Sequence, residues 1–253
     1  MFSIITSSLV RDMNLPFHDF TSKLDDEINS ISSQTLLLIF PEYCWRLTPI
    51  SDVFSYINTL KSKIHPNLCL VLGTLEFNLP NSNVLTSNAI ILHNNTLSYV
   101  PKTKVLRGEI NNGVSPGINP GIITLPNFRL AVLICADLWE PSLLYKLVIE
   151  QEADIIAVPA WTSTFKGNRS SARLDWHSLS RTISTQYSVI VAVSDHLHNH
   201  PNTDVANATI IFSPSNRSKS FPTHDVFRDI EHVNLETLYQ SRKRWKEKGL
   251  APL

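Results

Sequence analysis

The stretch FRLAVLICADLWEP, residues 128–141, joins an apolar run to the start of a helical pattern, with a cysteine at the junction. The apolar run predicts a buried strand, and Pro141 suits the first turn of a helix. Ligands usually bind at the carboxyl ends of strands in α/β sheets, and a nearby helix N-terminus favours a thiolate. Cys135 is therefore a candidate nucleophile, although a buried structural cysteine fits the same position.

The rest of the chain alternates strand-like runs with segments whose apolar residues recur every three or four positions, the spacing of a helix face. Strands are predicted at 2–9, 35–40, 68–77, 88–93, 96–100, 128–134, 154–159, 189–194 and 208–212. Helices are predicted at 17–31, 51–64, 140–152, 174–187 and 235–248. Ser51 is expected to cap the second helix, Asn94-Asn95 to turn a hairpin, and residues 107–121 to form a loop.

The order of these elements indicates the fold class. Strand–helix alternation predicts a layered α/β architecture, and the hairpin predicts mixed rather than purely parallel sheets. No internal repeat, low-complexity linker or break in composition divides the chain. We therefore expect residues 1–253 to form a single domain.

Composition excludes several classes of protein. Lys+Arg and Asp+Glu are both 22, which gives no electrostatic reason to expect a nucleic acid or an anionic membrane as partner. No run approaches the roughly 18 apolar residues of a membrane span, and the N-terminus resembles a strand rather than a signal peptide. Three cysteines without regular spacing fit a reducing compartment, so a cytoplasmic location is expected.

Charged residues follow two other predicted strands. Glu42 ends the apolar segment TLLLIFPE, where partial desolvation would raise its pKa toward that of a useful base; a solvent-facing glutamate is the alternative. Lys102 and Lys104 follow the hairpin and share one side of an extended chain, so either could pair with Glu42 or remain solvated. Cys44, two residues beyond Glu42, is the second candidate nucleophile.

Three short blocks carry a resemblance to a known family. They are Phe40-Pro41-Glu42, Tyr99-x-x-Lys102-Thr103-Lys104 and Ile134-Cys135-x-Asp137-x-x-x-Pro141. In this order they resemble the signature blocks of the nitrilase (carbon–nitrogen hydrolase) superfamily. The similar pattern extends over nearly the whole chain, including Val158–Trp161 and the Arg-bearing helix and strand of Arg181–Ser194.

This resemblance implies a four-layer α-β-β-α sandwich, frequent dimerisation, and hydrolysis of non-peptide C–N bonds without a metal or an organic cofactor. It implies that Cys135 is the nucleophile, Glu42 the base and Lys102 the oxyanion partner. Lys102 matches better than Lys104 because the family places its lysine about three residues before an apolar residue, here Val105. The resemblance further indicates Glu109 as an additional active-site glutamate. In the mechanism that we expect, the backbone N–H of Ala136 donates to the oxyanion, and Trp161 is a candidate substrate contact, with Trp45 and Phe165 as other candidate lining residues.

The chain also departs from the family pattern. Arg181-Thr182-Ile183-Ser184-Thr185 stands where many members have Arg-Ala-x-Glu-Asn, which affects a supporting polar network rather than the triad. Seven glycines are few for such a fold. Asp137 and Trp139 resemble the amidase-like and glutaminase-like branches, since the true nitrilases place Trp-Glu directly after the cysteine.

Two polar segments have other interpretations. Asp195, His196, His198 and His200 could bind a transition metal, could contact substrate, or could form a polar loop that is rich in histidine by chance. We expect no metal there. The basic segment 241–248 is interpreted as a solvated helix face or a subunit contact.

Three functions remain open at this stage. The first is hydrolysis of a small-molecule carboxamide through a cysteine thioester, in a homodimer or higher homo-oligomer. The second is transfer of the acyl group to an amine, and the third is a non-catalytic binding or scaffold role. The intact set of Glu42, Lys102 and Cys135 favours the first.

Overall fold

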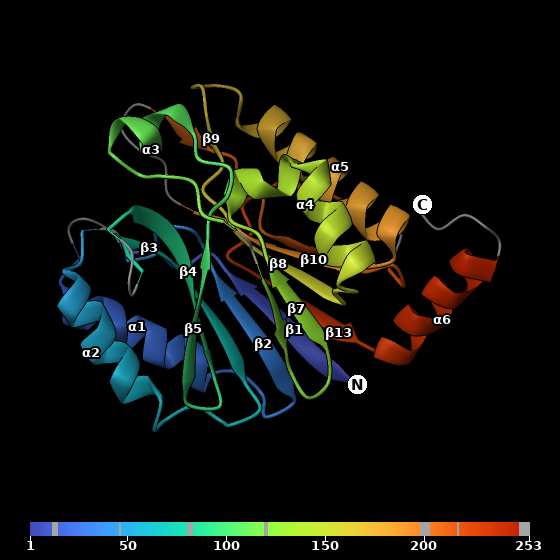
Figure 1. Cartoon of the computed structure of the whole chain (residues 1–253), viewed down its shortest axis with the longest axis horizontal. Helices are drawn as coiled ribbons and strands as arrows, with labels where there is room; N and C mark the ends of the chain where they lie inside the picture. The colour runs from blue at the N-terminus through green and yellow to red at the C-terminus, as the bar shows by residue number, and fades with distance from the viewer. Residues whose placement is uncertain are drawn as a thin grey trace.

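Two β-sheets pack face to face in the computed structural model, which describes residues 1–11, 15–45, 47–79, 83–118, 121–197, 203–216 and 218–247 (Figure 1). The larger sheet has the strand order β13-β1-β2-β3-β4-β5, and the smaller has the order β12-β10-β8-β7-β6. Helices α1 and α2 cover the outer face of the larger sheet, and α4 and α5 cover the smaller one. The predicted four-layer α-β-β-α sandwich with mixed sheets is confirmed.

The described elements of the larger sheet and its helices are β1 (Phe2–Ser7), α1 (Phe17–Asn29), β2 (Thr35–Phe40), α2 (Ile50–Leu60), β3 (Cys69–Asn78), β4 (Leu85–His93), β5 (Thr96–Pro101) and β13 (Arg228–Val233). Those of the smaller sheet and its helices are β6 (Ile122–Thr124), β7 (Arg129–Val132), a 3₁₀ turn (Cys135–Trp139), α4 (Pro141–Leu144), a π-helical turn (Tyr145–Glu150), β8 (Ile155–Pro159), α5 (Arg169–Tyr187), β10 (Ile190–Ser194) and β12 (Ile210–Phe212). Outside both lie α3 (Arg107–Asn111), α6 (Leu235–Glu247) and the short pair β9 (Ser163–Thr164) and β11 (Asp204–Val205).

The central strands are apolar throughout because both of their faces are buried. In β2, Leu37 and Ile39 pack between the two sheets, whereas Leu38 and Phe40 pack against α1 and α2. Successive strand residues point to opposite faces, so a continuous apolar run fills both cores. Within the described residues, no helix is long and apolar enough to cross a bilayer.

The strand directions bring several chain segments to one edge. In the larger sheet β1, β2 and β3 run parallel, and β5 runs the same way because β4 reverses between them. In the smaller sheet β7, β8 and β10 are parallel. The segments that leave the carboxyl ends of β2, β5, β7, β8 and β10 build the site described below.

Several predicted boundaries were wrong. Pro49 occupies the N-cap of α2, so Ser51 lies in the first helical turn and does not cap it; the fixed φ of proline suits that position. Helix α5 begins at Arg169, before the predicted residue 174, and α3 forms inside the predicted loop 107–121. The helix expected over 140–152 begins at Pro141 and changes to a π-helical turn at Tyr145.

Candidate active site

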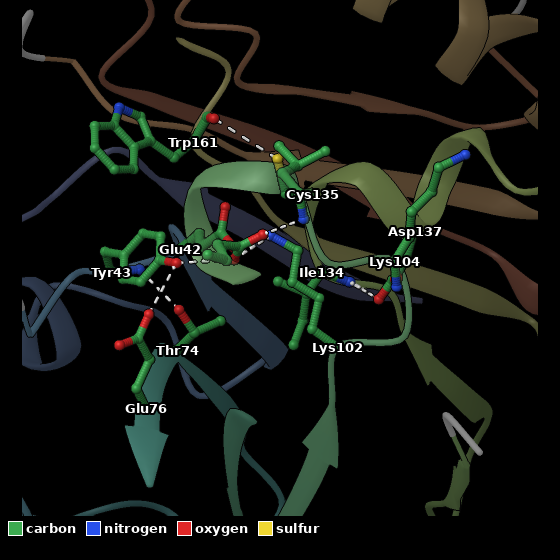
Figure 2. A network of polar contacts seen from close by, with 12 residues as sticks. Glu42, Tyr43, Thr74, Glu76, Lys102, Lys104, Ile134, Cys135, Asp137 and Trp161 are labelled. Carbon is green, nitrogen blue, oxygen red and sulfur yellow. Dashed lines mark hydrogen bonds and ion pairs between the residues drawn. The ribbon is translucent and has the colours of Figure 1, made fainter. Parts of the chain in front are cut away.

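Glu42 is presented by a tight turn directly after β2. The turn is possible because β3 has a glycine at its closest approach: a Cβ on Gly73 would lie 2.3 Å from the Pro41 carbonyl oxygen and 2.5 Å from the Cys44 sulfur. Tyr43, the next residue, adopts a positive φ of 54°. The result is a glutamate that is 1% exposed and whose carboxylate lies beside the ammonium of Lys102 (Figure 2).

Lys102 follows β5 and is as deeply buried as Glu42. Its ammonium nitrogen lies 2.7 Å from Oε1 of Glu42 and 2.8 Å from Oε1 of Glu109. Burial alone would lower the pKa of this lysine, but the charges of Glu42, Cys135 and Glu109 raise it above its usual value. The lysine is therefore a fixed cation and cannot serve as a base near neutral pH.

Cys135 follows β7 at the start of the 3₁₀ turn, with a φ of 47°. Non-glycine residues in this region are strained, and such strain concentrates at functional sites. The thiol is 5% exposed and donates to the carbonyl oxygen of Trp161 at 3.6 Å. Burial and the charge of Glu42 raise its pKa, while Lys102 opposes that shift, so the resting group is a thiol rather than the thiolate that the helix N-terminus suggested.

The Glu42 carboxylate is suited to accept that proton. Burial raises its pKa to about 7, although the charge of Lys102 and the hydrogen bond from its ammonium both oppose the shift. A carboxyl group with a pKa near neutrality is the kind of base that proton transfer at physiological pH requires. Thiol, base and cation thus meet in one buried place.

Asp137 links the segment that carries Lys102 to the 3₁₀ turn that carries Cys135. Its carboxylate accepts from the backbone N–H groups of Thr103, Lys104 and Ile134 at 3.1, 2.6 and 3.1 Å, and from the Thr103 hydroxyl at 2.8 Å. These donors come from segments that follow β5 and β7, in different sheets. The side chain therefore sets the position of Lys102 relative to Cys135.

Replacing Asp137 with asparagine should destabilise this junction. The amide group keeps one acceptor oxygen but turns its NH₂ toward backbone donors, so at least one charge-assisted hydrogen bond is lost. We expect the free energy of unfolding to fall by about 2 kcal/mol. Denaturant unfolding of the variant beside wild type measures this; equal midpoints would contradict the clamping role of Asp137.

Solved structures match the chain over almost its whole length. The Nit3 protein of Saccharomyces cerevisiae, a member of branch 10 of the nitrilase superfamily, is 17% identical, and the match covers 96% of this chain and 93% of that one with a TM-score of 0.75. An amidase of the nitrilase superfamily from Nesterenkonia AN1 is 12% identical over 98% and 97% of the two chains, with a TM-score of 0.70.

The chain has the nitrilase fold. A carbon–nitrogen hydrolase superfamily protein of Xanthomonas campestris, solved with an arsenic adduct in its active site, matches it similarly, at 14% identity over 97% of this chain and 95% of that one, with a TM-score of 0.74. No family model and no curated protein sequence matches the chain. The relationship is therefore carried by three-dimensional structure.

Within this nitrilase fold, other predicted site residues lie elsewhere. The Lys104 side chain is nearly half exposed and pairs with Glu140 at 3.3 Å, so Lys102 alone of the two lysines meets Glu42. Cys44 is buried and donates to the Leu72 carbonyl oxygen at 3.1 Å, within the core beside α1 and α2.

The other two aromatic residues considered as pocket lining are not packed around the thiol. Trp45 is wholly buried in the core beside α1 and α2, and Phe165 is 82% exposed. Trp161 lies near Cys135, with its ring stacked on His196 at 5.6 Å between centroids and met edge-on by Tyr43 at 5.5 Å. Trp161 is thus the aromatic candidate that the fold brings to the thiol.

The histidine segment has a structural role at its described end. His196 contacts the backbone carbonyl oxygen of Glu42 through Nε2, and the Asp195 carboxylate accepts from the N–H groups of Thr162, His196 and Ala208. His198 and His200 lie outside the described residues. Among the described residues, no group of three or more His, Cys, Asp or Glu side chains could hold a metal ion.

Arg181, the residue that this helix shares with the family pattern, packs against aromatic rings away from the site. Its guanidinium lies over the rings of Phe221 and Phe212, 4.2 and 5.2 Å from their centroids, and contacts the Lys219 carbonyl oxygen. These partners belong to the outer side of the smaller sheet. The residue therefore stabilises packing there and does not contact the Glu42–Lys102 pair.

The sequence did not indicate three parts of the site: Tyr43, Glu76 and the hydrogen bonds of Asp137 that join the two segments. The Tyr43 hydroxyl lies 2.9 Å from Oε1 of Glu109 and 3.2 Å from Oε1 of Glu76 (Figure 2). An extended chain would point Tyr43 to the side opposite Glu42, and only the positive φ at this residue brings both into the site. Its adjacency to Glu42 was the one available signal.

Proposed function

We propose that the protein belongs to the nitrilase superfamily and hydrolyses the C–N bond of small, linear carboxamides through a thioester on Cys135. One observation carries this proposal: the Cys135 thiol, the Glu42 carboxylate and the Lys102 ammonium converge in a single buried site. A thiol that attacks an amide needs a base for its proton and positive charge for the oxyanion, and these groups supply both.

The first half of the reaction forms the thioester. Glu42 accepts the thiol proton as the Cys135 sulfur attacks the carbonyl carbon. Lys102 and the N–H of Ala136 stabilise the negative oxygen of the tetrahedral intermediate. The C–N bond then breaks, and the proton held by Glu42 passes to the leaving ammonia or amine. Glu109, beside Lys102, orients this leaving group.

The second half regenerates the thiol. Water attacks the thioester carbonyl while Glu42 accepts one of its protons. The C–S bond breaks, the sulfur takes that proton back from Glu42, and the carboxylic acid leaves. Lys102 stays an ammonium in both halves because its pKa is raised by the surrounding negative charges.

Structures of related fold support this substrate class. The Nesterenkonia amidase has been solved with butyramide, and another variant of it shows acrylamide added to the active-site cysteine. Both molecules are small carboxamides. The aromatic ring of Trp161 beside Cys135 is proposed to contact the acyl portion of such a substrate.

The pH dependence of the reaction should follow Glu42. The carboxylate form is the base, and its pKa is raised to about 7. The value of kcat/KM should therefore fall about tenfold per pH unit below that point and level off above it. Initial rates at constant ionic strength from pH 5 to 9 test this; a rate that stays flat to pH 5 would exclude Glu42 as the base.

The experiment that tests the proposed function has two parts. Brief exposure to low iodoacetamide, followed by intact-mass spectrometry and peptide mapping, should label Cys135 once and leave the buried Cys44 and Cys69 unlabelled. A panel of small amides should then release ammonia with wild type. Labelling at Cys44 alone, together with no ammonia from any amide, would instead favour a non-catalytic binding protein.

Adding an amine distinguishes hydrolysis from acyl transfer. A hydrolase yields the free acid whether or not a competing amine is present, because water reaches the thioester. An acyl-transferring protein would convert most of the substrate to the new amide. Mass spectrometry of the products with and without hydroxylamine separates these two outcomes.

A further inference from the structure

Tyr43 is held in an unfavourable backbone conformation. Its φ of 54° is one that bulky aromatic residues rarely adopt. The backbone N–H donates to the Thr74 hydroxyl at 2.9 Å, and the ring packs edge-on against Trp161. Contacts on both sides therefore maintain the conformation, and it aims the hydroxyl at the Glu109 carboxylate beside Lys102 (Figure 2).

The hydroxyl has one proton and two acceptors within reach. It lies 2.9 Å from Oε1 of Glu109 and 3.2 Å from Oε1 of Glu76. Because a phenol donates a single hydrogen bond, the proton can serve only one carboxylate at a time. The shorter distance favours Glu109, and rotation about the C–O bond of Tyr43 would transfer the donation to Glu76.

Glu109 depends on few groups for its position. Its Oε2 accepts from the backbone N–H of Leu106 at 2.8 Å, the bond of a helix-capping glutamate at the start of α3. Its Oε1 is shared between Lys102 and Tyr43. Without the Tyr43 hydroxyl, the oxygen that faces Lys102 would keep only the lysine as a partner.

We propose that Tyr43 is a positioning residue that holds the Glu109 carboxylate against Lys102, with Glu76 as the second acceptor that its hydroxyl takes when Glu109 turns to the leaving amine. This role rests on the proposed amide hydrolysis. With Glu109 held in place, the Lys102 ammonium pairs with both Glu42 and Glu109 in the resting protein. Tyr43 acts through Glu109 and does not itself exchange a proton with substrate.

The charge arrangement predicts the direction of the effect. The negative charge of Glu109 raises the pKa of Glu42, and the ion pair with Lys102 lowers it. When Glu109 loses the Tyr43 hydroxyl, one of the two hydrogen bonds to Oε1 is gone, and the carboxylate can move away from Lys102 and Glu42. Glu42 then experiences less repulsion and has more of the Lys102 charge, so it ionises at lower pH.

The test uses Tyr43→Phe, which keeps the ring and removes the hydroxyl. The rate of Cys135 alkylation by iodoacetamide is measured from pH 5 to 9, which requires no substrate. We expect its pH midpoint to move down by about half a unit. With an amide that wild type hydrolyses, kcat should fall about tenfold, the loss of one charge-assisted hydrogen bond, with KM within about twofold.

Tyr56→Phe is the matched control. That hydroxyl donates to Oδ1 of Asp25 at 2.7 Å, between α1 and α2 and away from the site. Its loss should lower thermal stability as much as Tyr43→Phe does, without moving the alkylation midpoint or kcat. A purely structural role for Tyr43 would make the two variants alike, and that result would overturn the proposal.

Testing Tyr43→Phe in the Glu109→Gln variant shows whether Tyr43 acts through Glu109 or in another way. In Glu109→Gln the carboxylate that Tyr43 is proposed to hold is gone, so adding Tyr43→Phe should leave the midpoint where Glu109→Gln alone puts it. An equal shift in both backgrounds would show that Tyr43 does not act through Glu109. Because alkylation is read without substrate, this result stands apart from whether any amide is hydrolysed.

Discussion

Replacing Cys135 with alanine is expected to abolish amide hydrolysis while leaving the chain folded. In the proposed reaction this side chain supplies the atom that bonds to the acyl carbon, and no other described thiol reaches Lys102, so the loss should be at least about 10⁴-fold. Cys135→Ser should lose nearly as much, because a serine hydroxyl is far less acidic than a thiol and Glu42 cannot ionise it. Ammonia release at pH 8 measures both.

Cys69→Ala is the control for this experiment. Cys69 is a fully buried strand residue in the core between the sheets, so its loss should lower stability without changing the reactive thiol. The variant should keep kcat within about threefold, a barrier change of well under 1 kcal/mol. Substantial turnover by Cys135→Ala, with any amide, would mean that another residue is the nucleophile.

Replacing Lys102 with methionine should remove activity and destabilise the fold. Methionine fills a similar volume but leaves the buried carboxylate of Glu42 and the partly buried carboxylate of Glu109 without their shared cation. Breaking a buried ion pair costs about 3–5 kcal/mol when the remaining charge stays ionised. The oxyanion would also lose its charged partner, a loss of at least about 10²-fold in kcat.

The stability loss in Lys102→Met should depend on pH. Glu42 already has its pKa raised to about 7, and without the ammonium it rises further, whereas in the unfolded chain it stays near its usual value. The folded variant therefore holds a proton that the unfolded chain has released, and stability falls as pH rises through this interval. Urea unfolding at pH 6 and pH 8.5 should show the larger deficit at pH 8.5.

Lys104→Met is the matched control for the lysine. Its ammonium pairs with Glu140 at 3.3 Å on the surface, and such pairs contribute less than about 1 kcal/mol. Both activity and stability should stay near wild type across the same pH range. Equal deficits in the two lysine variants would contradict the assignment of Lys102 as the buried cation.

The order of strands and helices was predictable because each element is indicated by the pattern of apolar residues within its own segment. Apolar runs such as 35–40 and helical spacing such as that from Phe17 to Ile28 depend only on nearby residues, and both were confirmed. Strand β13 was missed because its sequence, RDIEHV, is largely polar and pairs with β1 from more than 200 residues away. The residues of such a strand do not by themselves indicate that it pairs with a distant one.

The site was predictable to the extent that its residues stand at strand ends. Glu42, Lys102 and Cys135 each follow a predicted strand, and the structure brings all three together. Tyr43 was not predictable, because strand alternation points it away and a left-handed turn reverses it. Helix α3 lacks a Ser or Thr cap, so nothing before Glu109 indicated that this loop would turn helical.

The proposed base and the proposed nucleophile follow strands of different sheets, and this division has a consequence for the core between them. Glu42 moves with the larger sheet and Cys135 with the smaller, so residues such as Ile39 and Val191 that pack between the sheets also set the gap between the reacting groups. A displacement of about 1 Å in such a gap costs about 10²-fold in rate. Hydrophobic packing between the sheets would thus set the distance over which the proposed proton transfer and attack take place.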